Sequence, residues 1–274
     1  MSRSARGFTL VEMVVVIVIT GVIAAAVAVF IRQPVQGYVD TTRRAEMSDI
    51  ADTALRRMAR DLKLALPNSI RITDGGQTLE LLLTRSGGRY RTEGAGFLDF
   101  SQLASSLTQL GPLAGGVGQT IIAGDQLVIY NLGSGLTDVD AYVGGNRATV
   151  TNVDNSTPNE PIINFSPKQF RFESPDARFQ IVEGPVSYAC DLAAGQRNLT
   201  RYSAYPIAPM QLTAASLAAS AALRALAASN VTTCAFDYTT GVTARSGVVA
   251  LTLQISVGGE SVQLYQEAHV SNTP

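Results

Sequence analysis

An apolar run near the N-terminus constrains this chain more than any other feature. From Phe8 to Ile31, Glu12 is the only ionisable side chain. As a helix rising about 1.5 Å per residue, this segment extends roughly 36 Å, enough to cross a hydrocarbon core of about 30 Å. A carboxylate at the centre of a bilayer costs on the order of 3 kcal/mol, and less near the interface. Because such a residue is normally functional, we expect Glu12 to have a specific partner.

The charges that flank the run bear on its orientation. Arg3 and Arg6 precede it, as expected of a cytoplasmic leader. Arg32, Arg43 and Arg44 follow it, so charge counting alone does not fix which end faces the cytoplasm.

A cleaved secretory signal is the simplest alternative for this segment. The alanine-rich stretch 24–28 offers small residues at which a signal peptidase could cut. Glu12 lies inside the apolar core, where such signals rarely carry an acid, and the chain beyond the alanines continues as a helix. Both features count against a cleaved signal.

An amphipathic helix is predicted after the apolar run. Its apolar residues recur at steps of three and four, and they are Met47, Ile50, Ala51, Ala54, Leu55, Met58, Leu62 and Leu66. Charged residues fill the other positions, with Asp52 and Arg56 in the favourable i,i+4 order. Pro67 should end the helix, while Pro34 and Gly37 should bend or loosen it between its two halves.

The segment from Gly7 to Glu12, Gly-Phe-Thr-Leu-Val-Glu, is followed by the apolar helix and resembles the prepilin motif of type IV pilins and type II secretion pseudopilins. The resemblance implies that a prepilin peptidase cleaves between Gly7 and Phe8 and methylates the new amine of Phe8. It also implies that Glu12 pairs with the amine of a neighbouring subunit during filament assembly. In a low-dielectric surrounding, that pairing is strong and sets the stagger between subunits.

Four regions follow from this resemblance. Residues 1–7 are a cytoplasmic leader peptide, residues 8–31 a transmembrane helix that becomes the filament core, and residues 32–66 its amphipathic continuation. Residues 67–274 form a pilin-like domain that is first periplasmic and then extracellular. The chain is thus expected in the inner membrane with a cytoplasmic N-terminus, and later in a pilus.

Strand patterns dominate after Pro67. We expect a hairpin of 69–73 with 78–84, a turn at 86–88, and a glycine-rich loop at 94–118 containing a short helix near 97–110. An alanine-rich helix is predicted at 213–229, and a terminal hairpin turns at Gly258 and Gly259. Further strands are predicted at 119–122, 126–131, 147–153, 169–173, 178–182, 186–190, 234–238, 248–257 and 261–270. The fold class is therefore α+β, with the long helix packed on an antiparallel sheet.

Three further segments resemble a subgroup of minor pilins. Leu66 to Arg71, Gly87 to Arg91 and Glu267 to Asn272 look like MshO-type minor pilins of the mannose-sensitive haemagglutinin (MSHA) pilus. This implies a low-copy subunit that helps to start pilus assembly. Two alternatives stay open: a type II secretion minor pseudopilin, and an enzyme or binding domain that uses the first helix only as an anchor or export signal.

The two cysteines, Cys190 and Cys234, lie far downstream of the apolar run. In an oxidising compartment they could form a disulfide, whereas in a cytosolic protein they would be buried free thiols. Their spacing does not suggest a metal site, since there is no CxxC pair and no histidine near them.

No catalytic residue is predicted. His269 is the only histidine and lies in a predicted strand close to the C-terminus. Asp138 and Asp140 could begin a calcium loop, but Tyr142 and Val143 stand where that loop needs an oxygen ligand and a glycine. A formal net charge of −1 gives no nucleic-acid footprint. We expect no metal or cofactor, and as partners the peptidase, other pilins, the inner-membrane assembly platform and the membrane.

Overall fold

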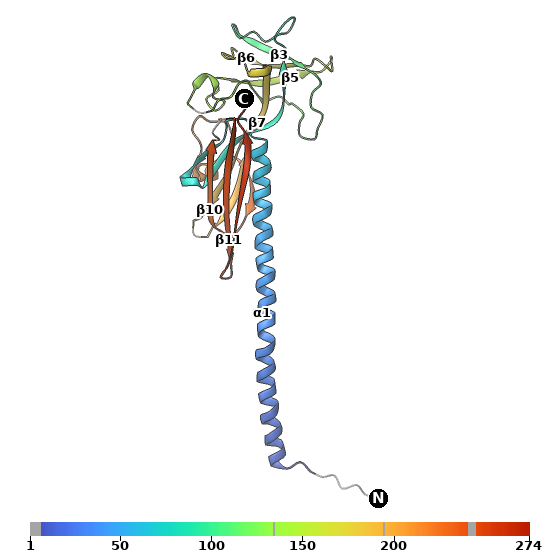
Figure 1. Cartoon of the computed structure of the whole chain (residues 1–274), viewed down its shortest axis with the longest axis vertical. Coiled ribbons are helices and arrows are strands. Elements are labelled where there is room, and N and C mark those ends of the chain that lie inside the picture. The colour runs from blue at the N-terminus through green and yellow to red at the C-terminus, as the bar shows by residue number, and fades with distance from the viewer. Residues whose placement is uncertain (1–6, 134, 194, 241–244) are drawn as a thin grey trace.

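The computed structural model describes residues 7–133, 135–193, 195–240 and 245–274. One long helix projects from a β-rich domain that gathers at its C-terminal end, and the helix start lies at the opposite end of the molecule (Figure 1). The predicted α+β arrangement, a long N-terminal helix packed on antiparallel sheets, is confirmed.

Helix α1 spans Leu10–Lys63, or roughly 80 Å. It continues without interruption past Pro34 and Gly37, so the predicted bend is wrong. A single proline removes one backbone donor, and the hydrogen bonds of the turns on either side continue the helix. The helix also ends three residues earlier than predicted, because the Leu66 N–H already pairs with the carbonyl of Leu82 (2.8 Å) in a sheet.

Within the described residues, twelve strands, one further helix and three short 3-10 turns follow α1. The further helix is α2 (Ala214–Ala219), and the turns are η1 (Asp74–Gly76), η2 (Thr137–Val139) and η3 (Pro175–Ala177). The strands are β1 (Arg71–Thr73), β2 (Thr78–Tyr90), β3 (Ala104–Leu110), β4 (Gln126–Val128), β5 (Arg147–Asp154), β6 (Ile162–Lys168), β7 (Arg178–Asp191), β8 (Asn198–Ser203), β9 (Leu223–Ala228), β10 (Val231–Thr240), β11 (Ser246–Val257) and β12 (Glu260–Ser271).

The last three strands form a small antiparallel sheet in the order β10-β11-β12. Strands β11 and β12 pack against α1, and their hairpin turns at Gly258 and Gly259 as predicted. The first hairpin, β1 with β2, is also confirmed. Both hairpins combine a period-2 pattern with a glycine-rich turn, which together specify register locally.

The other nine strands form one antiparallel sheet that closes on itself. Strands β2, β3, β6, β5, β4 and β7 are each hydrogen-bonded to the next, and β7 pairs again with β2. We call this closed circuit of six strands the distal ring. It lies beyond the C-terminal end of α1, where β3, β5 and β6 are drawn in Figure 1. Closure leaves those six strands without an unpaired edge along the circuit.

The described residues form four hydrophobic clusters, and the two largest are the main cores. The first lies between α1 and the strands beside it, and includes Met47, Leu55, Met58, Leu62, Leu79, Leu81, Tyr188, Val249, Leu251 and Leu253. The second core belongs to the distal ring and includes Tyr90, Leu107, Leu127, Val150, Ile163, Phe165, Phe179 and Ile181. The long strands β2 and β7 contribute to both, so they tie the distal ring to the helix.

The predicted apolar stripe of α1 faces the first core, and one acid accompanies it. Asp61 is 8% exposed and accepts hydrogen bonds from the Tyr188 hydroxyl and the Arg201 Nε, both at 2.8 Å. Burial, and then the charge of Asp61, raise the pKa of Tyr188. The three side chains join α1 to β7 and β8. Because the Asp61 carboxylate is buried, water would not readily replace a lost hydrogen-bond partner.

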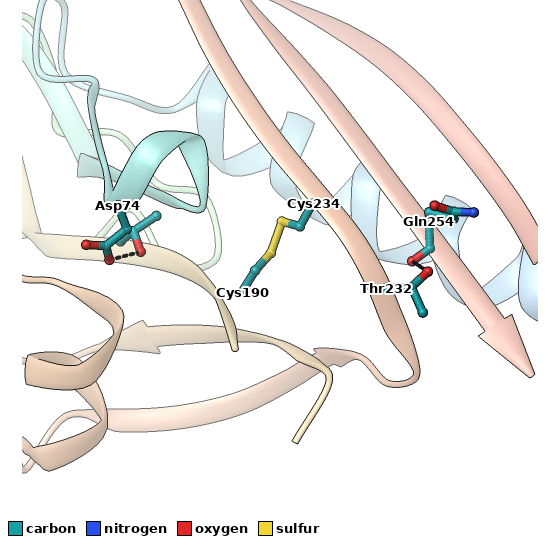
Figure 2. The surroundings of a disulfide bond; sticks show 6 residues. Asp74, Cys190, Thr232, Cys234 and Gln254 are labelled. Carbon is teal, nitrogen blue, oxygen red and sulfur yellow. Dashed lines mark hydrogen bonds between the residues drawn. A yellow bond between two sulfur atoms is a disulfide. The ribbon is translucent and has the colours of Figure 1, made fainter. Parts of the chain in front are cut away.

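A disulfide between Cys190 of β7 and Cys234 of β10 connects the two sheets (Figure 2). Both residues are buried in the first core, and 44 positions separate them. On the chain-entropy model, closing a loop of that length stabilises the fold by roughly 4 kcal/mol.

Glycines 87 and 88 do not form the predicted turn. Strand β2 runs straight through them, and both pair with β7. A Cβ on Gly87 would lie 3.0 Å from the Phe179 carbonyl oxygen, and one on Gly88 would lie 3.0 Å from the Phe179 ring. Glycine at these two positions therefore allows β2 and β7 to approach each other closely. In the sequence alone, the same pair of glycines was interpreted as a turn.

The short helix predicted near 97–110 is wrong, and the helix predicted at 213–229 is right only in part. Residues 104–110 form β3, which the distal ring needs between β2 and β6. In the alanine-rich segment only Ala214–Ala219 is helical, and Leu223–Ala228 pairs with β8 as β9. Neither segment has a clear helical face, so strand pairing with a neighbour outweighs the intrinsic preference of alanine.

Two strand predictions also fail, because residues 119–122 and 169–173 are irregular, although Ile121 and Phe170 fill the second core. Strands β6 and β8 were not predicted. The strands predicted separately at 178–182 and 186–190 are one continuous strand, β7, with a bulged region between them.

Replacing Asp61 with alanine should lower the free energy of unfolding by about 3 kcal/mol, because it leaves the largely desolvated guanidinium of Arg201 unpaired. Asp52→Ala is the matched control, since Asp52 pairs with Arg56 on the exposed face of the same helix. That change should cost less than about 1 kcal/mol. Urea denaturation of the full chain in detergent measures both, and equal losses would contradict the role given to Asp61.

Candidate functional site

The predicted processing and assembly residues lie together where α1 begins. Gly7 and Phe8 precede the helix without regular secondary structure, Thr9 is its extended N-cap residue, and Phe8 is 83% exposed. A Cβ on Gly7 would meet nothing within 4 Å. The fold itself therefore makes no demand for glycine at this position.

Thr9 and Glu12 form a capping box at the helix start. The Glu12 N–H donates to Thr9 Oγ1 (3.2 Å), and the Thr9 backbone N–H donates to Glu12 Oε2 (3.0 Å). The Thr9 hydroxyl also lies 3.1 Å from the same Oε2. This arrangement satisfies two backbone donors that a helix start otherwise leaves unpaired. It also places a negative charge at the positive end of the helix dipole.

The capping box gives Glu12 a partner within its own chain, which the sequence analysis missed. Thr-Leu-Val-Glu fits the Ser/Thr-x-x-Glu pattern of a capping box, so the signal was present. Both bonds from Thr9 end on Oε2, and Oε1 accepts no hydrogen bond within the described residues. The carboxylate is thus oriented while one of its oxygens remains available.

The apolar segment that follows makes no contact with the domain. Its large side chains from Phe8 to Ile31 are exposed, and the helix carries a stretch long and apolar enough to cross a membrane. Those properties fit membrane anchoring. So much exposed apolar surface on a soluble molecule would favour aggregation, so this half of α1 requires another apolar surrounding.

An ion pair marks where the domain begins to hold the helix. Arg44 Nε lies 2.6 Å from Glu260 Oε2, at the tip of the β11–β12 hairpin. The hydrogen bond from Arg44 lowers the pKa of the Glu260 carboxyl, although both groups are exposed to solvent. N-terminal to this contact, α1 projects alone (Figure 1).

The other sequence candidates do not converge on a second site. His269 is exposed on β12, and Asp138 pairs with Arg171 (3.2 Å) at the end of η2. Asp140 is buried and accepts the Tyr142 N–H (2.8 Å) instead of facing a cation. Across the residues that the structure describes, no group of three or more His, Cys, Asp or Glu side chains could hold a metal ion.

Comparison with known proteins identifies the N-terminal segment. The family model described as the prokaryotic N-terminal methylation motif matches residues 2–28. No curated protein and no solved structure matches the chain. The matched residues include the capping box and most of the exposed apolar helix.

Replacing Thr9 with valine keeps the shape of the side chain but removes the hydroxyl that caps the helix. Loss of a cap typically costs about 1 kcal/mol, so amide exchange at residues 10–12 should accelerate roughly fivefold. NMR of the full chain in micelles measures this exchange. Thr20→Val is the matched control, because the Thr20 hydroxyl bonds only to carbonyls of its own helix. Unchanged exchange at residues 10–12 in Thr9→Val would contradict the capping role.

Proposed function

We propose that this chain, which its N-terminal motif marks as a type IV pilin- or pseudopilin-like subunit, is a minor pilin of an MSHA-type pilus. A prepilin peptidase cleaves it between Gly7 and Phe8 and methylates the Phe8 amine. The observation that carries the proposal is a free-standing apolar helix whose one carboxylate, Glu12, is held at its start. The role is structural rather than catalytic.

The space around Gly7 supports processing at this bond. Any side chain would fit at position 7 as far as this fold is concerned. A requirement for glycine then comes from an external partner, such as a protease that must approach the backbone closely. Residues 7–9 are exposed and outside the helix, so they are accessible to such an enzyme.

The geometry of Glu12 supports a role in assembly. Cleavage converts the Phe8 nitrogen into an amine that stays cationic after methylation. Thr9 holds Oε2, so Oε1 can accept the Phe8 amine of a neighbouring subunit while the capping box stays intact. In a lipid or packed-helix surrounding, such a pair is strong and costly to break. It therefore selects one axial position between adjacent helices.

The same proposal assigns the regions and their compartments. Residues 1–7 are removed, 8–31 anchor the chain in the inner membrane, and 32–66 continue into the domain of residues 67–274. The N-terminus is cytoplasmic and the domain periplasmic before it enters the pilus. The Cys190–Cys234 disulfide suits that oxidising compartment. Its partners are the prepilin peptidase, other pilins and the inner-membrane assembly platform.

The assignment to a pilus rests on the MshO-like segments. Two of them meet in space: the Asn68 side-chain amide donates to the Asn272 carbonyl (3.1 Å) and to the Asn131 carbonyl (2.9 Å). The link between helix end and C-terminus is thus built from residues that carry the resemblance. A type II secretion minor pseudopilin shares the N-terminal motif and is the competing assignment.

A strain that lacks this chain should regain wild-type numbers of pili when it is complemented with the wild-type gene, and far fewer with Glu12→Ala. The variant should insert and lose its leader normally, because Glu12 lies outside the scissile bond. Its amount in sheared pili should fall at least about tenfold, as expected when a buried cation loses its partner. Glu46→Ala is the matched control, an exposed acid on the same helix.

Wild-type levels of Glu12→Ala in pili would contradict the pairing role. Protein secretion by the same deletion strain separates the two assignments. Intact secretion with lost pili supports the minor pilin, whereas lost secretion with intact pili supports the pseudopilin.

A further inference from the structure

A polar groove opens on the distal ring, far from the N-terminal motif. It encloses about 600 Å³ and is lined by residues of β4, β5, β6 and β7, together with the segments 143–144 and 205–207. That volume lies within the roughly 300–1,000 Å³ range of small-ligand sites. In the view of Figure 1, β5, β6 and β7 lie at the end of the molecule away from the helix start.

Strand register places the polar residues of the groove side by side. Thr149 of β5 lies opposite Gln126 of β4, and Arg147 lies opposite Val128 two positions away on the same face. The Gln126 amide donates to Thr149 Oγ1 (3.1 Å), while Ser166 Oγ accepts the Thr149 N–H (3.1 Å). The Ser166 hydroxyl hydrogen is then left to donate to a ligand.

Arg147 is the cation of this groove, and within the described residues it forms no ion pair. The nearby acids have other partners: Asp138 pairs with Arg171, and Asp140 accepts the Tyr142 N–H. Burial lowers the pKa of the Arg147 guanidinium. The negative charge of Asp140 raises that pKa, but it offsets the effect of burial only in part. A half-buried guanidinium without a carboxylate is costly unless an anion joins it.

A second cation, Lys168, adds to the preference of the groove for an anion. The Lys168 ammonium donates a hydrogen bond to the carbonyl oxygen of Gly144 (2.7 Å), and Gly144 lines the groove. Burial, and then the positive charge of Arg147, lower the pKa of Lys168. Glu183 is the carboxylate among the lining residues, and it shares Arg85 with Asp125, at 3.4 and 3.1 Å. Within the described residues Arg147 and Lys168 have no carboxylate at ion-pair distance, so a bound anion could join them.

The rim of the groove is fixed before any ligand arrives. A Cβ on Gly145 would lie 1.9 Å from the Thr137 carbonyl oxygen, so only glycine fits at this point of the turn that leads into β5. Arg147, the first residue of β5, follows two positions later, so its backbone is attached to a closely packed turn. A preformed site loses less entropy on binding than a mobile one.

We propose that this groove binds a carboxylate flanked by hydroxyl groups, the chemistry shared by a free sugar acid and a uronate residue of an acidic polysaccharide. Arg147 pairs with the carboxylate, which its planar guanidinium can hold through two parallel hydrogen bonds. Ser166 donates to a hydroxyl group of the ligand. The Gln126 N–H groups already bond Gly124 and Thr149, so its Oε1 accepts from a ligand hydroxyl instead. Val143, Pro206 and Ile207 offer apolar contact to the ring carbons.

Isothermal titration of the full chain in detergent with galacturonate tests the proposal. Galacturonate should bind at one site, and its methyl ester, which keeps the hydroxyls but lacks the charge, should bind at least about tenfold more weakly. Inorganic phosphate, an anion without flanking hydroxyls, should also bind more weakly. Trigalacturonate distinguishes the two sources: tighter binding than the monomer indicates a polysaccharide, and equal binding indicates a free acid.

Arg147→Gln should weaken galacturonate binding at least about tenfold at unchanged melting temperature. Arg89→Gln is the matched control, because Arg89 is exposed on β2 outside the groove. The proposal is overturned if galacturonate does not bind, if the methyl ester or phosphate binds as tightly, or if Arg147→Gln binds like the wild type.

Discussion

The structure depends on removing the apolar surface of one helix, α1, from water. The C-terminal half of α1 buries its apolar stripe against two sheets, while the N-terminal half leaves its apolar side chains bare. At about 25 cal/mol per Å² of apolar surface, the bare half requires lipid or other helices around it. The same apolar surrounding raises the free-energy cost of an unpaired charge. Glu12 therefore restricts what can surround this half of α1, because its carboxylate needs a partner there.

The domain is organised to hold that helix and to carry a second structure beyond it. Asp61 bonds α1 to β7 and β8, the disulfide joins β7 to β10, and the tip of the last hairpin reaches Arg44. Strands β2 and β7 then continue past the helix end and close the distal ring with its own core. Anchoring and the proposed ligand groove thus occupy opposite ends of the molecule, which allows either to change without disturbing the other.

Sequence reading succeeded where local signals were strong. The 3.6-residue stripe of α1 and the glycine-turned β11–β12 hairpin appear as predicted, because period and turn chemistry act over a few residues. It failed at 97–110 and 213–229, where strand pairing decided the outcome, and it could not foresee the pairing of β7 with both β2 and β4. In the candidate site, Gly7, Phe8 and Glu12 are assigned from the motif and stay predictions, whereas the Ser/Thr-x-x-Glu pattern that marks Thr9 as a helix cap was overlooked. The groove around Arg147 depends on four strands distant in sequence, so no local pattern marks it.

The central claim is that a cleaved N-terminus supplies the charge that Glu12 meets in an assembly. Mass spectrometry of the N-terminal peptide, taken from the wild-type chain in its assembled form, tests this most directly. The account predicts a peptide that begins with methylated Phe8. A peptide that retains Met1, or one that begins after Ala26 or Ala28, would contradict it.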